Sequence, residues 1–289
     1  MRILVLDQFS ELGGAQACLL MGVAAMRDRG WRVAAGLAGG GELFGRIREL
    51  GCETFRVTCG PFGLGQKSIS DAARFLTQLP RLASEIRHGV EAFRPDLVYL
   101  NGPRLLPAAA LAGIKIPVLF HAHHNLASPG LRQLAGKALS FLQASAVACC
   151  RSVAESISPF VDSARLSVVF NGVAGPPRIR VRRRVSAPTI GCIGRISPEK
   201  GQMEFVAAAR LIHRTMPESR FLIYGAPLFS AVARRYQRRV IKAARGLPVA
   251  FPGWTHDVYS ALARFDLLLV PSARNEATTR VILEAFAVG

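Results

Sequence analysis

Short apolar runs alternate with segments of helical period along the whole chain. Runs such as Arg2–Leu6, Glu53–Val57 and Thr189–Ile193 have the length and composition of buried strands. Between such runs, segments such as Ala15–Arg29 repeat their apolar residues every three or four positions, which is typical of a helix with one buried face. This alternation predicts an α/β protein in which parallel strands form a sheet covered by helices on both faces.

The same pattern predicts two groups of elements. The first group has expected strands at Arg2–Leu6, Trp31–Leu37, Glu53–Val57, Asp96–Leu100, Pro117–His121, Ala144–Cys149 and Leu166–Phe170, and helices at Ala15–Arg29, Glu42–Leu50 and Ser70–Phe93. The second group has expected strands at Thr189–Ile193, Arg220–Tyr224, Val249–Phe251 and Leu267–Val270, and helices at Met203–Arg214, Phe229–Arg245, Asp257–Ala263 and Thr279–Val288. We expect Ser70 to cap its helix and Pro80 to interrupt or kink it.

The segment between the two groups differs from both in composition. Residues 174–188 are rich in proline and arginine and have no amphipathic period. We therefore expect residues 1–173 and 189–289 to form two Rossmann-like, doubly wound domains joined by this linker. The second domain has few expected strands and stops at a helix, so we expect it to be incomplete and the chain to be truncated.

Composition excludes several classes of protein. Half of the residues are hydrophobic, which excludes a disordered chain. The net charge of +18 is spread along the sequence, so it reflects either the codon bias of the source genome or an anionic partner such as a membrane surface. Nucleic acid ranks behind both and is not expected.

Cysteine usage and hydropathy indicate the cellular location. Six cysteines occur without metal-type spacing or a CxxC pair, which favours a reduced, cytoplasmic compartment. The amino terminus reaches Asp7 too early for a secretory signal, and no apolar run is long enough to span a bilayer. We expect neither export nor a transmembrane helix.

Two candidate sites follow strands of the first domain, because ligands of open parallel sheets bind at the carboxyl ends of the strands. Gly13 and Gly14 lie between the first strand and the first helix, where backbone N–H groups can approach an anion closely. His121 ends another expected strand, Pro117–His121, and His123 lies just after it, so in strand geometry the two point to the same side. Histidines can bind zinc, but no further ligands occur at a recognisable spacing, so no metal site is expected.

Two further candidates lie in the second domain. Arg195 and Lys200 share a loop between a strand and a helix, and such a pair of cations can hold a diphosphate. A solvated surface is the alternative for this loop. Glu284 lies within an apolar helix, where a carboxylate needs a partner, and the hydroxyls of a sugar or ribose would supply one.

Seven motifs occur in an order that resembles glycosyltransferase family 4. They are GGAQ at 13–16, the histidine-rich turn at 121–125, NGV at 171–173, GRISPEKG at 194–201, the glycine at 225, PGWTHD at 252–257 and PSARNEATTRVILEAFAVG at 271–289. The spacing of Glu276 and Glu284 matches the E-x7-E signature of that family. The resemblance implies a GT-B fold, in which two Rossmann-like domains face a cleft, and a retaining, metal-independent enzyme of the hexosyltransferase type.

The resemblance also implies a role for each candidate residue. His123 would lie near the anomeric carbon of the donor, where it positions and stabilises, and His121 is the alternative. Glu276, the second residue of the catalytic pair, would bind the hydroxyls of the donor sugar. Among the substrate-binding residues, Gly14 would cover the phosphates, Arg195 and Lys200 would hold the diphosphate, and Glu284 would bind the ribose. Gly13 and Gly225 would belong to the same substrate-binding set.

These roles imply a particular reaction. A nucleotide-diphosphate sugar would be the donor, with no cofactor, and a glycan or lipid-linked molecule would be the acceptor in polysaccharide biosynthesis. The enzyme would be cytoplasmic and peripheral on the inner face of the membrane. Two alternatives stay open: a catalytically silent binding fragment, and a GT-B epimerase that acts on a nucleotide sugar without an acceptor.

Overall fold

The computed structural model describes residues 1–60, 69–126, 129–175, 187–227, 231–272 and 277–289. Within them the chain divides into two compact units, Met1–Asn171 and Gly172–Gly289. The boundary lies close to the end of the expected first domain at residue 173. Most of the expected linker, residues 176–186, lies outside the described residues.

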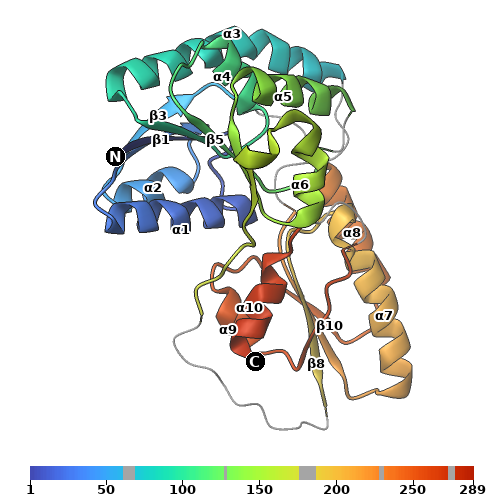
Figure 1. Ribbon diagram of the computed structural model, residues 1–289. Coiled ribbons are helices and arrows are strands. Elements are labelled where there is room, and N and C mark those ends of the chain that lie inside the picture. Colours follow the sequence, from blue (N-terminus) through green and yellow to red (C-terminus); the bar gives the residue numbers. More distant parts are fainter. Residues whose placement is uncertain (61–68, 127–128, 176–186, 228–230, 273–276) are drawn as a thin grey trace. The chain divides into compact units, whose positions relative to one another are not determined.

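The described part of the first unit contains one parallel sheet and six α-helices (Figure 1). Its strands are β1 (Arg2–Asp7), β2 (Arg32–Ala38), β3 (Glu53–Val57), β4 (Leu97–Leu100), β5 (Val118–Ala122), β6 (Ser145–Ala148) and β7 (Leu166–Val168). Its helices are α1 (Gly14–Asp28), α2 (Leu43–Glu49), α3 (Ile69–Phe93), α4 (Leu105–Leu111), α5 (Pro129–Phe141) and α6 (Arg151–Ile157). The strand order is β3-β2-β1-β4-β5-β6-β7, so the sheet grows outward in both directions from β1 and β4.

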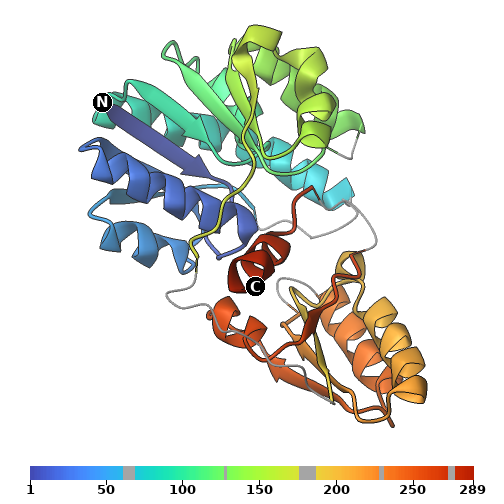
Figure 2. The ribbon, with the colours of Figure 1, turned by 60° about the horizontal axis from the view of Figure 1, so that its bottom comes forward.

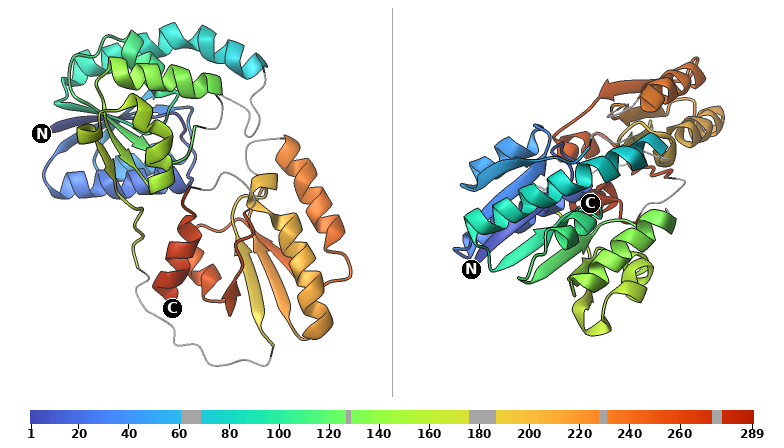
Figure 3. Two further views of the ribbon diagram at one scale, coloured as in Figure 1. Left: turned by 45° about the vertical axis from the view of Figure 1, so that its right-hand side comes forward. Right: turned by 90° about the horizontal axis from the view of Figure 1, so that it is seen from above.

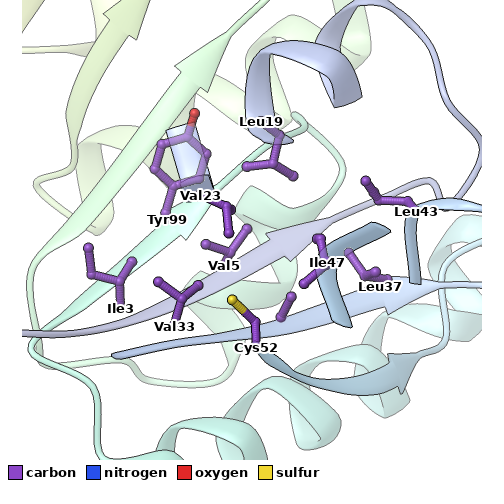
Figure 4. Packing of buried hydrophobic residues seen from close by; sticks show 11 residues of the cluster. Ile3, Val5, Leu19, Val23, Val33, Leu37, Leu43, Ile47, Cys52 and Tyr99 are labelled. Carbon is purple, nitrogen blue, oxygen red and sulfur yellow. The ribbon is translucent and has the colours of Figure 1, made fainter. Parts of the chain in front are cut away.

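Helices cover both faces of this sheet, as a doubly wound fold requires. Figure 2 shows α1 and α2 on one face, with α3 behind the other. Successive side chains of β1 point to opposite faces of the sheet. Ile3 and Val5 pack against Leu19 and Val23 of α1 (Figure 4), and the residues between them point to the other face. Each of these aliphatic side chains is buried, which stabilises the fold by roughly 1.5–3 kcal/mol per side chain.

The second unit repeats the plan on a smaller scale. Its strands are β8 (Thr189–Ile193), β9 (Arg220–Tyr224), β10 (Val249–Gly253) and β11 (Leu267–Leu268), and its helices are α7 (Gln202–Thr215), α8 (Ala231–Ala243), α9 (Val258–Leu262) and α10 (Arg280–Val288). The described strands pair in parallel in the order β10-β9-β8-β11. Helices α7 and α8 lie on one face, and α9 and α10 on the other (Figure 3).

Most of the expected elements are confirmed, and three strands match to the residue: Glu53–Val57, Thr189–Ile193 and Arg220–Tyr224. Two expectations for the long helix can be compared with the structure. The expectation that Ser70 caps the helix is wrong, because α3 spans Ile69–Phe93 and Ser70 lies within it. Pro80 does not interrupt the helix, and a kink at Pro80 stays a prediction.

The helices α4, α5 and α6 were not expected from the sequence. Helix α4 is apolar on every side and most of it is buried, so it has no amphipathic period to reveal it. None of the described helices has both the length and the apolar character needed to cross a bilayer.

Candidate functional site

In the first unit, polar side chains gather at the carboxyl ends of three adjacent strands. Asp7 ends β1, Asn101 follows β4, and His123 follows β5. These strands are neighbours in the sheet, and β1 and β4 flank the point where the strand order reverses. A crevice for a ligand is typical of this position in open parallel sheets.

A chain of hydrogen bonds joins these side chains. Asn101 donates from Nδ2 to Oδ2 of Asp7 over 2.6 Å, and its Oδ1 lies 2.8 Å from Nε2 of His123. Asp7 also accepts from Gln16 Nε2, at 3.1 and 3.2 Å to its two oxygens, and from the backbone N–H of Phe9 at 2.8 Å. The side chains are almost fully buried, with 0% of Asp7 and 2% of Asn101 exposed.

Burial changes the ionisation of this cluster. It raises the pKa of Asp7 to about 7, although the hydrogen bonds from Asn101, Phe9 and Gln16 act in the opposite direction. It lowers the pKa of His123 to about 3 and that of His121 to about 4. Both imidazoles are therefore neutral at physiological pH, and His123 can bind a ligand by hydrogen bonding but not by charge.

His121 lies within β5, and its ring stacks on that of His123. The two ring centroids are 3.9 Å apart, as expected for residues that point to the same side of a strand. Nδ1 of His121 is hydrogen-bonded to the hydroxyl of Tyr99, and its Nε2 is buried with no hydrogen-bond partner among the described residues. Both histidines are half-buried: His121 lies within β5 and stacks on His123, which directly follows the strand.

The glycine pair adjoins the same cluster. Gly13 is the N-cap of α1 and Gly14 its first residue, and both are exposed. The first turn of α1 also carries Gln16, which donates hydrogen bonds to Asp7 and so ties the start of α1 to the buried cluster. The structure therefore brings Gly13, Gly14 and His123 to one edge of the sheet, and the positive end of the helix dipole lies there as well.

In the second unit, residues 194–201 form a loop that is fixed at the carboxyl end of β8. The buried side chain of Gln202 holds it at two points: its Nε2 donates to the carbonyl of Arg195 at 2.8 Å, and its Oε1 accepts from the N–H of Ser197 at 3.2 Å. The loop closes in a short 3₁₀ helix, Pro198–Lys200, before α7 begins. Its course thus depends on a residue that the sequence did not single out.

Two glycines allow backbone segments to approach each other at this edge. Gly201 has φ of 71°, and a Cβ atom there would lie 1.9 Å from the carbonyl oxygen of Pro271, after β11. A Cβ atom at Gly225, after β9, would lie 2.0 Å from the carbonyl oxygen of Gly194. Both distances are far below van der Waals contact, so side chains are excluded and the loops after three strands meet closely.

The two cations of the loop have different surroundings. NH2 of Arg195 lies 3.3 Å from Oε1 of Glu199, and about a third of each side chain is exposed. Lys200 packs along the loop, since a Cβ atom on Gly194 would lie 3.8 Å from its Cδ. Burial raises the pKa of the Cys192 thiol to about 12, with the positive charge of Lys200 acting against this. Lys200 therefore lies at the carboxyl end of β8, where Cys192 is located.

Glu284 has a partner that the sequence interpretation missed. It lies one turn into α10, and its Oε1 is 3.3 Å from NH2 of Arg280. Only 12% of its side chain is exposed, and burial raises its pKa while Arg280 lowers it. Arg280 also donates to the carbonyl of Gly172 at 3.2 Å. The (i, i+4) spacing of Arg280 and Glu284 was the available signal for this pair.

The remaining expectations concern Glu276 and metal ions. Glu276 lies outside the described residues, as do Arg274 and Asn275 of the same motif. Among the described residues, no group of three or more His, Cys, Asp or Glu side chains is arranged to hold a metal ion. The described candidates thus form one cluster in the first unit, and in the second unit a cationic loop and a buried ion pair.

Comparison with known families gives two matches that together span most of the chain. Residues 13–181 match the family described as glycosyl transferase 4-like domain, and residues 187–289 match the family described as glycosyl transferases group 1. No curated protein matches the chain.

Several solved structures have the same fold. Alr3699/HepE of Anabaena, crystallised with UDP and glucose, is 22% identical with a TM-score of 0.78, covering 100% of this chain and 78% of that one. A glycosyltransferase of Rickettsia africae is 15% identical with a TM-score of 0.73, covering 99% and 77%. Sucrose-phosphate synthase of Thermosynechococcus elongatus is 17% identical with a TM-score of 0.74, covering 100% and 80%. The GT-B class expected from the sequence, with two Rossmann-like units, is confirmed.

Proposed function

Because the chain belongs to the glycosyl transferase 4-like family, we propose that it transfers a sugar from a nucleotide-diphosphate donor to a glycan or lipid-linked acceptor, with retention of the anomeric configuration. In this proposal the second unit binds the diphosphate and the first unit contributes His123. The enzyme is then a hexosyltransferase of polysaccharide or glycolipid assembly.

The observation that carries the proposal is the cationic loop after β8. Arg195 and Lys200 lie on a loop that Gln202 and Gly201 hold at the carboxyl end of the sheet. A guanidinium can bind two phosphate oxygens at once, and an ammonium adds a compact positive charge. A nucleotide diphosphate as the ligand is supported by the crystal structure of the similar protein Alr3699/HepE, which is in complex with UDP and glucose.

The chemistry of transfer explains why cations are needed here. Cleavage of the bond between sugar and diphosphate builds negative charge on the leaving group, and fixed cations stabilise that charge as it develops. In the proposed front-face reaction, the leaving phosphate assists deprotonation of the acceptor hydroxyl. His123 is neutral and hydrogen-bonded to Asn101, and we assign it to positioning the donor sugar by hydrogen bonding, since the front-face reaction needs no protein nucleophile.

Removal of either cation is expected to weaken nucleotide binding. The substitutions Arg195→Ala and Lys200→Ala should each raise the Kd of the cognate nucleoside diphosphate roughly ten- to a hundredfold, because each removes a charge-assisted contact. Isothermal titration of the full chain with UDP, GDP and ADP measures this effect.

The matched control is Arg220→Ala. Arg220 is exposed at the amino end of β9, the opposite edge of the same sheet, so its loss should leave the Kd unchanged. No binding of any of the three nucleotides, or equal affinities for all variants, would contradict the proposal. Donor turnover that requires an acceptor separates transfer from epimerisation.

We further propose that the enzyme binds anionic membrane surfaces peripherally. The support comes from α8, which carries Arg234, Arg235, Arg238, Arg239 and Lys242, all exposed, and no acidic residue. The opposite side of the helix is anchored in the core by Tyr236 and Val240. Such a face attracts anionic headgroups, by about 1 kcal/mol for each basic residue near the surface.

Charge reversal on α8 is expected to release the protein from anionic vesicles. The double substitution Arg235→Glu and Arg239→Glu should reduce flotation with vesicles that contain phosphatidylserine, and wild-type flotation should fall as salt screens the charges. Arg29→Glu with Arg48→Glu makes the same change of net charge on the first unit and serves as the control. Equal flotation with neutral and anionic vesicles, or equal loss in both variants, would contradict this role of α8.

A further inference from the structure

The carboxyl of Asp7 is the acceptor in its hydrogen bonds with Gln16, Asn101 and Phe9. Among the described residues, the three groups that form hydrogen bonds with its carboxyl are N–H donors: the amide of Gln16, the amide of Asn101 and the backbone of Phe9. An ionised carboxylate can only accept hydrogen bonds, so it is matched to this set of partners. Because the cluster is buried, water does not compete with the protein groups for these bonds.

The donors around Asp7 also fix the orientation of the Asn101 side-chain amide. Since Nδ2 of Asn101 donates to Asp7, Oδ1 of the same amide faces His123. A carbonyl oxygen can only accept, so Nε2 of His123 carries the proton and donates it. A neutral imidazole has one proton on its two nitrogens, so Nδ1 then carries a lone pair.

We infer that Asp7 is a positioning residue that acts through Asn101 to hold His123 as the Nε2–H tautomer, with Nδ1 left to accept a hydrogen bond from a sugar hydroxyl. The functional part of this inference rests on the proposed sugar transfer, whereas the tautomer does not. The stacked ring of His121 limits rotation of the His123 ring and so helps to keep this arrangement.

The substitution Asp7→Asn separates this role from a merely structural one. The side-chain oxygen of the new residue can keep the bond from the Phe9 N–H, which places its NH2 group opposite Asn101. Two donors would then face each other, and rotation of the Asn101 amide by 180° relieves the conflict. After that rotation NH2 of Asn101 faces His123, whose Nε2 must become the acceptor, so the tautomer changes to Nδ1–H.

The test is ¹⁵N NMR of the full chain labelled at histidine, recorded at pH 8.5, where Asp7 is ionised. Long-range ¹H–¹⁵N correlations distinguish the two tautomers, and the variant His123→Gln identifies the signals of His123. We expect the Nε2–H pattern in the wild type and the Nδ1–H pattern in Asp7→Asn. An Nδ1–H pattern in the wild type would by itself overturn the inference, whatever the Asp7→Asn variant shows.

A control variant and a kinetic measurement complete the test. Gln16→Leu removes one donor to Asp7 but leaves the contact of Asn101 with His123, so it should keep the Nε2–H pattern. In a transfer assay, Asp7→Asn should lower kcat roughly tenfold or more with little change in the KM of the nucleotide sugar. An unchanged tautomer in folded Asp7→Asn contradicts the inference, whereas a wild type with the expected tautomer but no transfer contradicts the proposed function alone.

Discussion

Replacement of Gly201 by alanine is expected to lower the free energy of unfolding of the second unit by roughly 3 kcal/mol. Two costs add up at this position. The left-handed backbone, with φ of 71°, is unfavourable for any residue with a Cβ atom, and that atom would collide with the carbonyl oxygen of Pro271. A backbone oxygen cannot rotate away as a side chain can, so the loop itself must move.

Gly246→Ala is the matched control for this variant. Gly246 has a similar φ of 78°, but nothing lies within 4 Å of the position of a Cβ atom. Only the backbone cost, roughly 1 kcal/mol, should appear there. Trp254 is the tryptophan of the second unit, so urea unfolding in a Trp31→Phe background can be followed by its fluorescence. Equal losses for the two glycine variants would show that the contact with Pro271 has no energetic effect.

The stability of the first unit is expected to rise between pH 4.5 and 6. The pKa values of His121 and His123 are about 4 and 3 in the fold, so in this range the unfolded chain binds two protons that the folded chain does not. Asp7 acts in the opposite direction, because its pKa of about 7 lets the folded chain keep a proton that the unfolded chain loses. The two histidines together outweigh Asp7 by one proton, so the free energy of unfolding should rise by about 1.4 kcal/mol per pH unit.

The substitution Asp7→Asn tests this balance, since it removes the opposing group. The slope should then approximately double, to about 2.8 kcal/mol per pH unit. Urea unfolding of the full chain in a Trp254→Phe background measures it through Trp31, the tryptophan of the first unit. A stability that stays flat or falls between pH 4.5 and 6 would show that the two histidines are not held neutral by burial.

Prediction from sequence succeeded where a local pattern carries the information. The strand Thr189–Ile193 is a short apolar run before a glycine, and it was predicted to the residue. The helix α5 was missed because Gly130 and Gly136 weaken its helical signal, and α6 because it has only seven residues. These helices are stabilised mainly by packing against the rest of the unit, and only weakly by the helix propensity of their own residues.

For the candidate site, too, local sequence patterns pointed to single residues but not to contacts between distant ones. His123, Arg195 and Lys200 were singled out as candidates because each follows an apolar strand within a recognisable motif, and their roles stay predictions. Asp7 and Asn101 also end or follow such strands, but they are 94 residues apart and become neighbours only through the pairing of β1 with β4. The position of each residue at the end of an apolar strand can be read from the sequence, whereas their hydrogen bond cannot.

The position of β1 between β2 and β4 also constrains how the unit is made. Ile3 pairs with Val33 on one side and with Leu97 on the other. On a ribosome, the first strand can join β2 after a few dozen residues have emerged, but its other edge stays open until β4 has been synthesised. Throughout that interval the nascent chain exposes the unpaired edge of an apolar strand, which is a surface prone to aggregation.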